Sequence, residues 1–230
     1  MKLWIAALAA AALAACTQPA PTTEAPVEQA RPVAAASGEY QLDPNHSTVT
    51  VNALRFGLAN YVLRFNAVSG TLNFNAEDPT LSTVQASVAI SSIDTPYSGE
   101  RNFDAELQNS AWLDSVNHPT ATFRSTSVER TGPNTARVTG DLELKGVTRP
   151  ITLDVTYNAS QRAPWGAPIM LIGFSAHGAI PRSQFGINEM TQTPGAMDGV
   201  ADAVQLQIEA VFTRPIENEP PAREPAEPVN

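Results

Sequence analysis

Apolar and polar residues alternate along several stretches of this chain of 230 residues, and that period of two is the feature that most restricts its fold. Successive side chains of a strand point to opposite faces, so each stretch predicts a strand with one face in a core and the other toward water. The clearest stretches cover residues 84–90, 138–144, 151–157 and 204–212. Hydrophobic residues make up 43% of the chain, which is enough for one core.

Two local signals add detail to these strands. The segment from Lys145 to Pro150 indicates a hairpin turn between two alternating stretches, with Gly146 at its tip. The alternation changes phase between Phe65 and Val68, which indicates a β-bulge.

Helical periodicity is scarce in the chain. It predicts one short helix over residues 100–110 and one further turn over residues 54–60. About eight strands in one domain close most easily as a barrel, because closure removes the exposed strand edges. We therefore predict an all-β fold: an antiparallel, lipocalin-like β-barrel of about eight strands with one or two short helical insertions. Periodicity alone does not distinguish a hollow barrel from a filled one.

The N-terminus carries a targeting signal. Lys2 supplies a positive charge, and the apolar run that follows is too short to cross a bilayer as a helix. The run ends in Leu-Ala-Ala-Cys, which resembles a bacterial lipobox, and Cys16 is the only Cys of the chain. We predict a lipoprotein signal peptide over residues 1–15 and lipidation of Cys16; the alternative is an ordinary signal peptide with an incidental Cys. The next residue is Thr17 and not Asp, which favours a periplasmic, lipid-anchored protein at the outer membrane.

Two segments lack the large apolar residues that a core needs. Residues 16–38 combine the lipidated Cys with a Pro- and Ala-rich stretch, and residues 215–230 are rich in Pro and Glu. Such segments cannot bury enough surface to offset their chain entropy, so a disordered tether and a disordered tail are expected. A docking or cell-wall-spanning role is the alternative for the tail. The folded domain is predicted as residues 39–214.

Composition and residue patterns exclude several classes of function. The net charge of −9 argues against binding to a phosphate backbone, so no nucleic-acid partner is expected. One Cys and three His leave too few ligands for the usual metal sites, so no metal is predicted. Ser175 lacks the G-x-S-x-G spacing of a nucleophile elbow. The strand acids Asp141, Glu143 and Asp154 are out of phase with the apolar residues and belong to solvated faces. No catalytic residue is predicted.

Five motifs, in order along residues 39–214, resemble those of the YceI-like, polyisoprenoid-binding proteins. They are Tyr40–Ser47, Ser92–Thr95, Trp112–Asp114 followed by His118–Thr126, Val138–Ile151, and Pro181–Gly186. The resemblance implies a secreted lipocalin-like barrel with a long apolar channel. The channel would hold lipids with extended tails, such as isoprenoid quinones or polyprenyl chains. The resemblance implies no established enzymatic activity, and no cofactor beyond such a bound lipid or quinone.

The channel should be lined by one face of several strands. The candidate lining residues are Phe65, Phe74, Val88, Phe123, Leu142, Leu144, Phe174 and Phe212. His46 and Arg182 are the polar residues expected nearest the ligand, since the fork of Arg donors can pair with an anionic or carbonyl head group. The alternative for Arg182 is an internal salt bridge with Asp43 or Asp94.

The chain also departs from the family pattern. Arg55, Glu106 and Lys145 stand where His is usual, Phe103 stands for Arg, and Leu63 stands for Gly. The loss of three His and one Arg weakens any role that needs those groups at the head of the ligand. The argument for an apolar channel is unaffected.

The leading hypothesis is a lipid-anchored envelope protein that binds a long-chain amphiphile for carriage, storage or sequestration. Its expected partners are an isoprenoid or other long-chain lipid, the membrane reached through Cys16, and a second copy in a homodimer. The protein is not expected to be an enzyme. The alternatives are an envelope enzyme acting on a bound quinone or lipid, against which the missing His residues argue, and a stress-related structural lipoprotein with a filled barrel.

Overall fold

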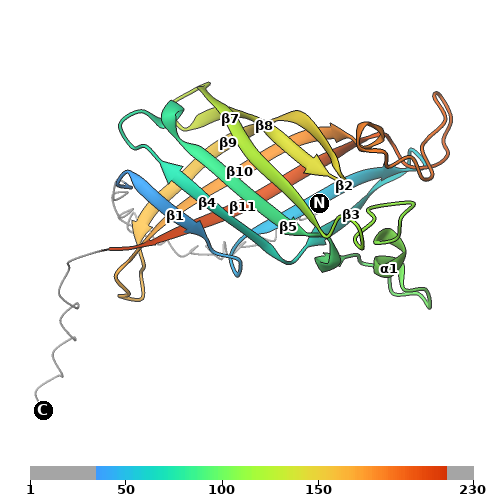
Figure 1. Cartoon of the computed structure of the whole chain (residues 1–230), viewed down its shortest axis with the longest axis horizontal. Coiled ribbons are helices and arrows are strands. Elements are labelled where there is room, and N and C mark those ends of the chain that lie inside the picture. Colours follow the sequence, from blue (N-terminus) through green and yellow to red (C-terminus); the bar gives the residue numbers. More distant parts are fainter. Residues whose placement is uncertain (1–34, 217–230) are drawn as a thin grey trace, which may run out of the picture. The chain divides into compact units, whose positions relative to one another are not determined.

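The computed structural model describes residues 35–216, which form an antiparallel β-barrel (Figure 1). Eight strands pair in succession around the barrel, and the last pairs back onto the first through Gln41 and Thr213. In spatial order they are β1 (Gly38–Leu42), β4 (Val68–Phe74), β5 (Thr83–Ala89), β7 (Thr120–Arg130), β8 (Thr135–Leu144), β9 (Val147–Arg162), β10 (Ile169–Pro181) and β11 (Ala203–Pro215). The predicted antiparallel barrel of about eight strands is confirmed.

Three further strands extend the wall at one end. They are β2 (Thr48–Arg55), β3 (Ala59–Phe65) and the short β6 (Ile93–Asp94). The N-terminal half of β11 pairs with β2 and its C-terminal end pairs with β1, so β1 and β2 occupy one position of the barrel in succession. On the side away from β11, β1 pairs with β4 and β2 pairs with β3. The neighbouring position of the barrel is therefore also occupied by two strands, β4 and β3, one after the other.

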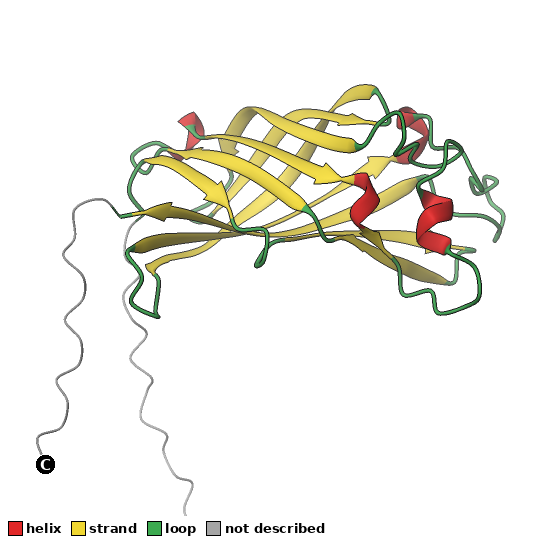
Figure 2. Cartoon of the chain, turned by 60° about the horizontal axis from the view of Figure 1, so that its bottom comes forward, coloured by secondary structure: helices red, strands yellow, loops and turns green. Residues whose placement is uncertain are grey.

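Short helical segments lie at the rims of the barrel (Figure 2). One helix, α1 (Phe103–Leu107), begins after Asn102, whose side chain accepts a hydrogen bond from the Ala105 amide. The predicted helix over residues 100–110 is therefore present but shorter. The other segments are the 3₁₀ turns η1 (Pro79–Leu81), η2 (Ile90–Ser92) and η3 (Arg182–Phe185). α1, η2 and η3 each bury an apolar residue in the same cluster, so together they cap one end of the barrel.

The hairpin turn predicted at Gly146 is confirmed. Leu144 pairs with Val147, so the loop has two residues, Lys145 and Gly146. Both have positive φ, 51° and 72°, as a type I′ turn requires. A Cβ on Gly146 would lie 2.5 Å from the ring of His118, so the tight turn and this close contact both require glycine.

Two other local predictions were wrong. Residues 54–60 form no helical turn: β2 and β3 pair through this segment, and the chain reverses at Phe56 and Gly57, both at positive φ. The phase change between Phe65 and Val68 is not a bulge, because β3 ends and β4 begins there and the two pair with different strands. Register shifts occur instead within β7–β8 and β9–β10.

The structure also bears on the ends of the folded domain. Ala35 is 6% exposed, and the Arg214 guanidinium donates to the Ser37 carbonyl over 2.7 Å. At the other end the Ile216 amide donates to the Pro168 carbonyl. The folded domain therefore extends at least over residues 35–216. Cys16, the predicted signal peptide and nearly all of the predicted tether and tail lie outside the described residues.

The barrel interior divides into two clusters of buried residues. The first, here the capped cluster, lies beneath α1, η2 and η3 and contains Phe65, Ile90, Ile93, Leu144, Ile180 and Phe185 among others. The second, here the terminal cluster, lies where β1 starts and β11 ends and contains Tyr40, Leu72, Ile172 and Phe212 among others. In Figure 1 these two regions are at opposite ends of the barrel.

Candidate functional site

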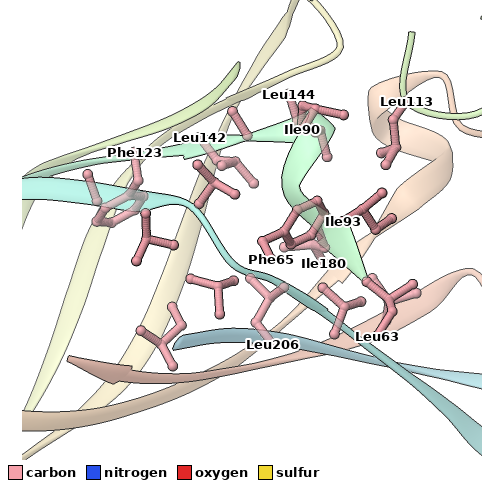
Figure 3. A pocket seen from close by; sticks show the side chains of 18 of the residues that line it. Leu63, Phe65, Ile90, Ile93, Leu113, Phe123, Leu142, Leu144, Ile180 and Leu206 are labelled. Atoms are coloured by element: carbon pink, nitrogen blue, oxygen red, sulfur yellow. The ribbon is translucent and has the colours of Figure 1, made fainter. Parts of the chain in front are cut away.

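An apolar cavity of about 240 Å³ lies inside the barrel on the side of the capped cluster. Its surface is aliphatic and aromatic carbon, contributed by every barrel strand except β9 together with β2, β3 and β6. Figure 3 shows Phe65, Ile93 and Ile180 converging on its centre, with Leu142 and Leu144 on one wall and Leu206 on the opposite one. A site of this kind takes up hydrocarbon and offers little to a charged group.

Five of the predicted lining residues are at this cavity. Phe65, Val88, Phe123, Leu142 and Leu144 contribute to its wall. They come from β3, β5, β7 and β8, and Phe65 and Leu144 are each only 8% exposed. Alternation along these strands correctly predicts that their side chains point into the barrel.

The other three predicted residues are placed elsewhere. Phe74, Phe174 and Phe212 belong to the terminal cluster and do not line the cavity. The Phe174 ring packs edge-on against Phe212, with 6.1 Å between centroids, and against Tyr157 at 5.8 Å. Alternation sets the face of a side chain but not its level along the barrel, so these rings point inward and fill the other half.

His46 lies outside the cavity, in the turn between β1 and β2. Its side chain is 69% exposed, and its Nδ1 is 2.7 Å from Oδ2 of Asp43. Slight burial would raise the pKa of Asp43, but hydrogen bonds from the His46 side chain and the Asn45 amide outweigh it and leave that pKa below its ordinary value. The pair fixes the turn and does not line the cavity.

Arg182 does contribute to the cavity wall, but its guanidinium serves the protein. The residue is 4% exposed, and all five of its N–H donors have an acceptor in the chain. The acceptors are the carbonyls of Ile187, Glu189, Val200 and Ala201 and the Thr191 hydroxyl, at 2.8–3.3 Å. Burial lowers the pKa of Arg182, an effect that Asp202 and Glu189 oppose. Arg182 therefore holds the loop over residues 187–201 against the barrel and has no donor left for a head group.

Within the described residues, Arg182 forms no salt bridge with Asp43 or Asp94, the two partners considered for it. Asp43 pairs with His46, and Asp94 pairs with Arg64 over 3.0 Å. The guanidinium of Arg182 instead lies 5.7 Å from the centre of the Trp112 ring, which lines the cavity.

Sequence reasoning missed several wall residues. They include Val49, Val51, Ala53, Leu63, Ile93, Trp112, Leu113, Ile187 and Leu206. The alternation of Val49, Val51 and Ala53 along β2 was a usable signal. The contributions of Trp112 and Ile187 come from loops that have no periodicity, so the sequence gives no sign of them.

The residues that depart from the family pattern are all near this end. Leu63 lines the cavity, and Phe103 packs against the capped cluster. The Lys145 ammonium donates to the carbonyls of Ala111 and Gly186 and so ties the β8–β9 turn to two loops. Arg55 forms an isolated bridge with Val200.

The groups considered for catalysis lie apart on the outer surface. The Ser175 hydroxyl donates to Glu209 over 2.5 Å and accepts from the Asn158 amide, on the outside of β10. Within residues 35–216, no three His, Cys, Asp or Glu side chains gather as metal ligands would. Nor does any helix in that range have the length and apolar character needed to cross a bilayer.

Solved structures with similar folds support this architecture. BcnA of Burkholderia cenocepacia aligns over 74% of this chain and 98% of its own, with a TM-score of 0.61 and 24% identity. The YceI protein of Campylobacter jejuni aligns over 68% and 86%, with a TM-score of 0.59 and 24% identity. A polyisoprenoid binding domain from Saccharophagus degradans, implicated in plant cell wall breakdown, aligns over 76% and 98%, with a TM-score of 0.55 and 15% identity.

Sequence relatives give the family. UPF0312 proteins of Pseudomonas putida are 36% identical over 115 residues, which is 50% of this chain and 56% of theirs. A UPF0312 protein of Ectopseudomonas mendocina is 40% identical over 85 residues, 37% of this chain and 43% of its own. The matches thus span about half the length of these relatives or less. The YceI-like domain model matches residues 40–212, nearly the whole described barrel, and the chain therefore belongs to the YceI-like family.

Proposed function

We propose that this protein binds the hydrocarbon chain of a long, uncharged lipid, a polyisoprenoid or an isoprenoid quinone, for carriage, storage or sequestration. The observation that carries the proposal is the cavity of about 240 Å³ with a wall of almost unbroken carbon. Ligand pockets are usually about 300–1,000 Å³, so the cavity would hold one stretch of a long chain and not the whole molecule. Each CH₂ group buried there contributes about 0.8 kcal/mol.

The charges around the cavity favour an uncharged ligand. Arg182 and Glu209 are the ionisable residues of its wall, and both are engaged with protein partners. An anionic group drawn into this cavity would lose its hydration and find no free cation, which costs more than the apolar contacts return. The similarity in fold to the polyisoprenoid binding domain of Saccharophagus degradans is consistent with a lipid of this kind.

The most direct test is native mass spectrometry of the full-length protein with and without added geranylgeraniol, an uncharged isoprenoid alcohol. The expected result is a one-to-one complex that survives gentle desolvation. Geranylgeranyl phosphate, which has the same tail and an anionic head, should bind at least tenfold more weakly. A protein that takes up neither compound, and releases no lipid on denaturation, would support the filled-barrel alternative.

We further propose that Cys16 anchors the protein to the periplasmic side of the envelope, with the outer membrane favoured by Thr17. Cys16→Ser should move the protein to the soluble fraction of fractionated cells while its far-ultraviolet circular dichroism stays unchanged. A variant that still sediments with membranes would contradict the anchor.

The proposed role is binding and not catalysis. A redox or acid–base step on a bound quinone needs a titratable group beside the ligand, and the cavity wall holds none that is free of a protein partner. Incubation with a bound quinone should return the quinone unchanged, and a product of altered mass would favour the enzyme alternative.

A further inference from the structure

The barrel wall is interrupted on one side, between two lips. The β1–β4 pairing ends at Gln41 and Thr71, and the β2–β3 pairing begins only at Val49 and Phe65. The first lip is the turn between β1 and β2, residues 42–48. The second lip is the corner between β3 and β4 with the start of β4, residues 66–70. Within the described residues no hydrogen bond joins residues 43–47 to residues 67–70.

Hydrogen bonds hold each lip to a different neighbour. On the first lip, the Asp43 amide donates to the Val211 carbonyl over 2.8 Å, and the Ser47 hydroxyl accepts from the Val211 amide over 3.0 Å. On the second lip, the Asn66 amide donates to the Ser92 carbonyl, and the Ala67 carbonyl accepts from the Ala89 amide. One lip is thus fixed to β11 and the other to β5 and η2, so the gap between them belongs to the fold.

The cavity reaches this gap. Its wall includes Leu42, Ser47 and Thr48 of the first lip and Val68 and Ser69 of the second. Elsewhere along β1 and β2, the strands are paired on this side, β1 with β4 and β2 with β3.

Hydroxyl groups gather beside the gap on the outer face of the barrel. Ser69, Ser87 and Thr122 alternate with the inward residues Val68, Val88 and Phe123, so their hydroxyl groups lie on the outer face beside the second lip. Thr48 and Glu209 alternate with Val49 and Ala210 and also point outward. Ser69, Ser87 and Thr122 are cross-strand neighbours in one row, and Glu209 pairs with Thr48. Arg182, the basic residue of the cavity wall, is at the capped end with every donor engaged.

The capped end offers a poor passage. Trp112, Leu113 and Ile187 form the wall there, and Arg182 ties down the loop over residues 187–201. The capped end has a polar group that could bind the polar end of a ligand instead. The Tyr61 hydroxyl is buried there without a hydrogen-bond partner in the described chain. Tyr61 packs against Phe103 and is not part of the cavity wall.

We infer that the lipid passes sideways through the gap between the lips, and that its polar end stays at the gap, toward the outer face where these hydroxyl groups lie. The hydrocarbon chain then points inward toward the capped end. This inference rests on the proposed function, since it needs a ligand in the cavity. It adds the route and the orientation of that ligand.

A bulky group attached to one lip tests the route. The Cys16→Ser background leaves an introduced Cys as the sole thiol. Ala67→Cys is then labelled with a polyethylene-glycol maleimide, because Ala67 lies on the second lip, is exposed and is not part of the cavity wall. Binding of the apolar fluorescent probe N-phenyl-1-naphthylamine is followed by stopped flow. The label should slow both association and dissociation at least tenfold and change Kd less than threefold, since it obstructs a path and not the site.

Two labelled controls locate the effect. Ser127→Cys is an exposed Ser on the outer face of β7 away from the lips, and its label should change both rates less than twofold. Val116→Cys lies beyond the wall residues Trp112 and Leu113 and is 89% exposed. Its label should also be without effect. Slow binding with the Val116 label and unchanged binding with the Ala67 label would overturn the inference in favour of the capped end.

The orientation is tested without a label. Tyr61→Phe should change the displacement of the probe by geranylgeraniol less than twofold if the alcohol group stays at the lips. A tenfold loss would place the polar end beside Tyr61 and overturn the orientation. A wild-type protein that binds neither probe nor alcohol refutes the proposed function itself, whereas unchanged binding rates with the Ala67 label refute only the route.

Discussion

The two ends of the barrel share long strands but differ in what fills them. At the terminal end, Tyr40, Phe74, Tyr157, Phe174 and Phe212 pack edge-on against one another. At the capped end the inward residues are mainly Val, Leu and Ile, and about 240 Å³ is left unfilled. Interlocking rings thus fill the terminal end, whereas the aliphatic side chains of the capped end pack together and still leave a cavity between them.

The difference extends to polar groups. In the terminal cluster, Tyr40 is fully buried, and its hydroxyl donates to the Ala36 carbonyl over 2.8 Å. Burial raises the pKa of that hydroxyl, although nearby Arg214 opposes the shift. At the capped end the guanidinium of Arg182 is buried, and its hydrogen bonds hold a loop against the barrel. The terminal end of the barrel is thus closely packed, whereas the capped end encloses a cavity.

The largest expected effect comes from emptying the filled half. Phe212→Ala removes a ring that is 4% exposed and should cost about 3–5 kcal/mol of unfolding free energy, measured by urea denaturation. Probe affinity of the folded protein should change less than threefold, because Phe212 does not line the cavity. A tenfold loss of affinity would mean that the two halves are coupled. Phe174→Leu provides a milder variant if the first does not fold.

A charge placed in the hollow half should abolish binding instead. Leu144→Glu puts a carboxylate into the carbon wall, and the affinity for N-phenyl-1-naphthylamine should fall about 100-fold, or about 2.7 kcal/mol. Glu143→Gln, one residue away on the exposed face, should leave affinity unchanged. Binding is measured only on variants that melt cooperatively. If Leu144→Glu does not fold, Leu144→Gln is used as an uncharged polar replacement. Equal binding by both variants would remove Leu144 from the site.

The same substitution can be made in both halves on one strand. Val84 and Val88 lie on the same face of β5, the first against the terminal cluster and the second at the cavity. Val84→Leu should destabilise by about 1–2 kcal/mol through overpacking. Val88→Leu has space for the added methylene and should change stability by less than about 0.5 kcal/mol while weakening probe binding. Similar stability losses in the two variants would show that the cavity collapses in solution.

The smallest expected effect concerns Asp43 on the first lip of the gap. Because the folded state depresses the pKa of Asp43, its ionised form stabilises the fold above the unfolded pKa of about 4, and that contribution is lost as pH falls through the folded value. Asp43→Asn should therefore lower the melting temperature slightly at pH 7 and not at pH 2.5. Thermal melts at the two pH values measure this, with Asp141→Asn on the outer face as the control. A deficit that persists at pH 2.5 would assign the effect to geometry and not to charge.

Much of the fold follows from local pattern. Alternation predicts the strands and the inward face of Phe65, Leu142 and Leu144, and the Lys145–Gly146 turn follows from the short gap between two alternating stretches. What alternation lacks is the level of a residue along the barrel axis, since that depends on strand stagger. Phe174 and Phe212 were therefore assigned to the correct face and to the wrong end.

The role of Arg182 was beyond sequence reasoning for a different reason. Four of its five acceptors are backbone carbonyls, which every residue possesses and which no side-chain pattern can indicate. In a sequence, Asp43 and Asp94 are suggested as partners of Arg182 only because they carry the opposite charge. The residues that satisfy a buried cation can be identified only once the loop is folded.

Closure of the barrel has a consequence for crowding. In the described chain, β3 pairs with β6 only at Arg64 and Phe65, so residues 59–63 have no strand partner on that side, and an ion pair between Arg64 and Asp94 lies at the end of this open edge. Unpaired strand edges are the templates on which chains aggregate, and charged residues on a short edge discourage such growth. Anchoring to a membrane surface would raise the local concentration of this protein greatly. Charge at the end of this free edge would oppose strand-to-strand pairing between copies packed on such a surface.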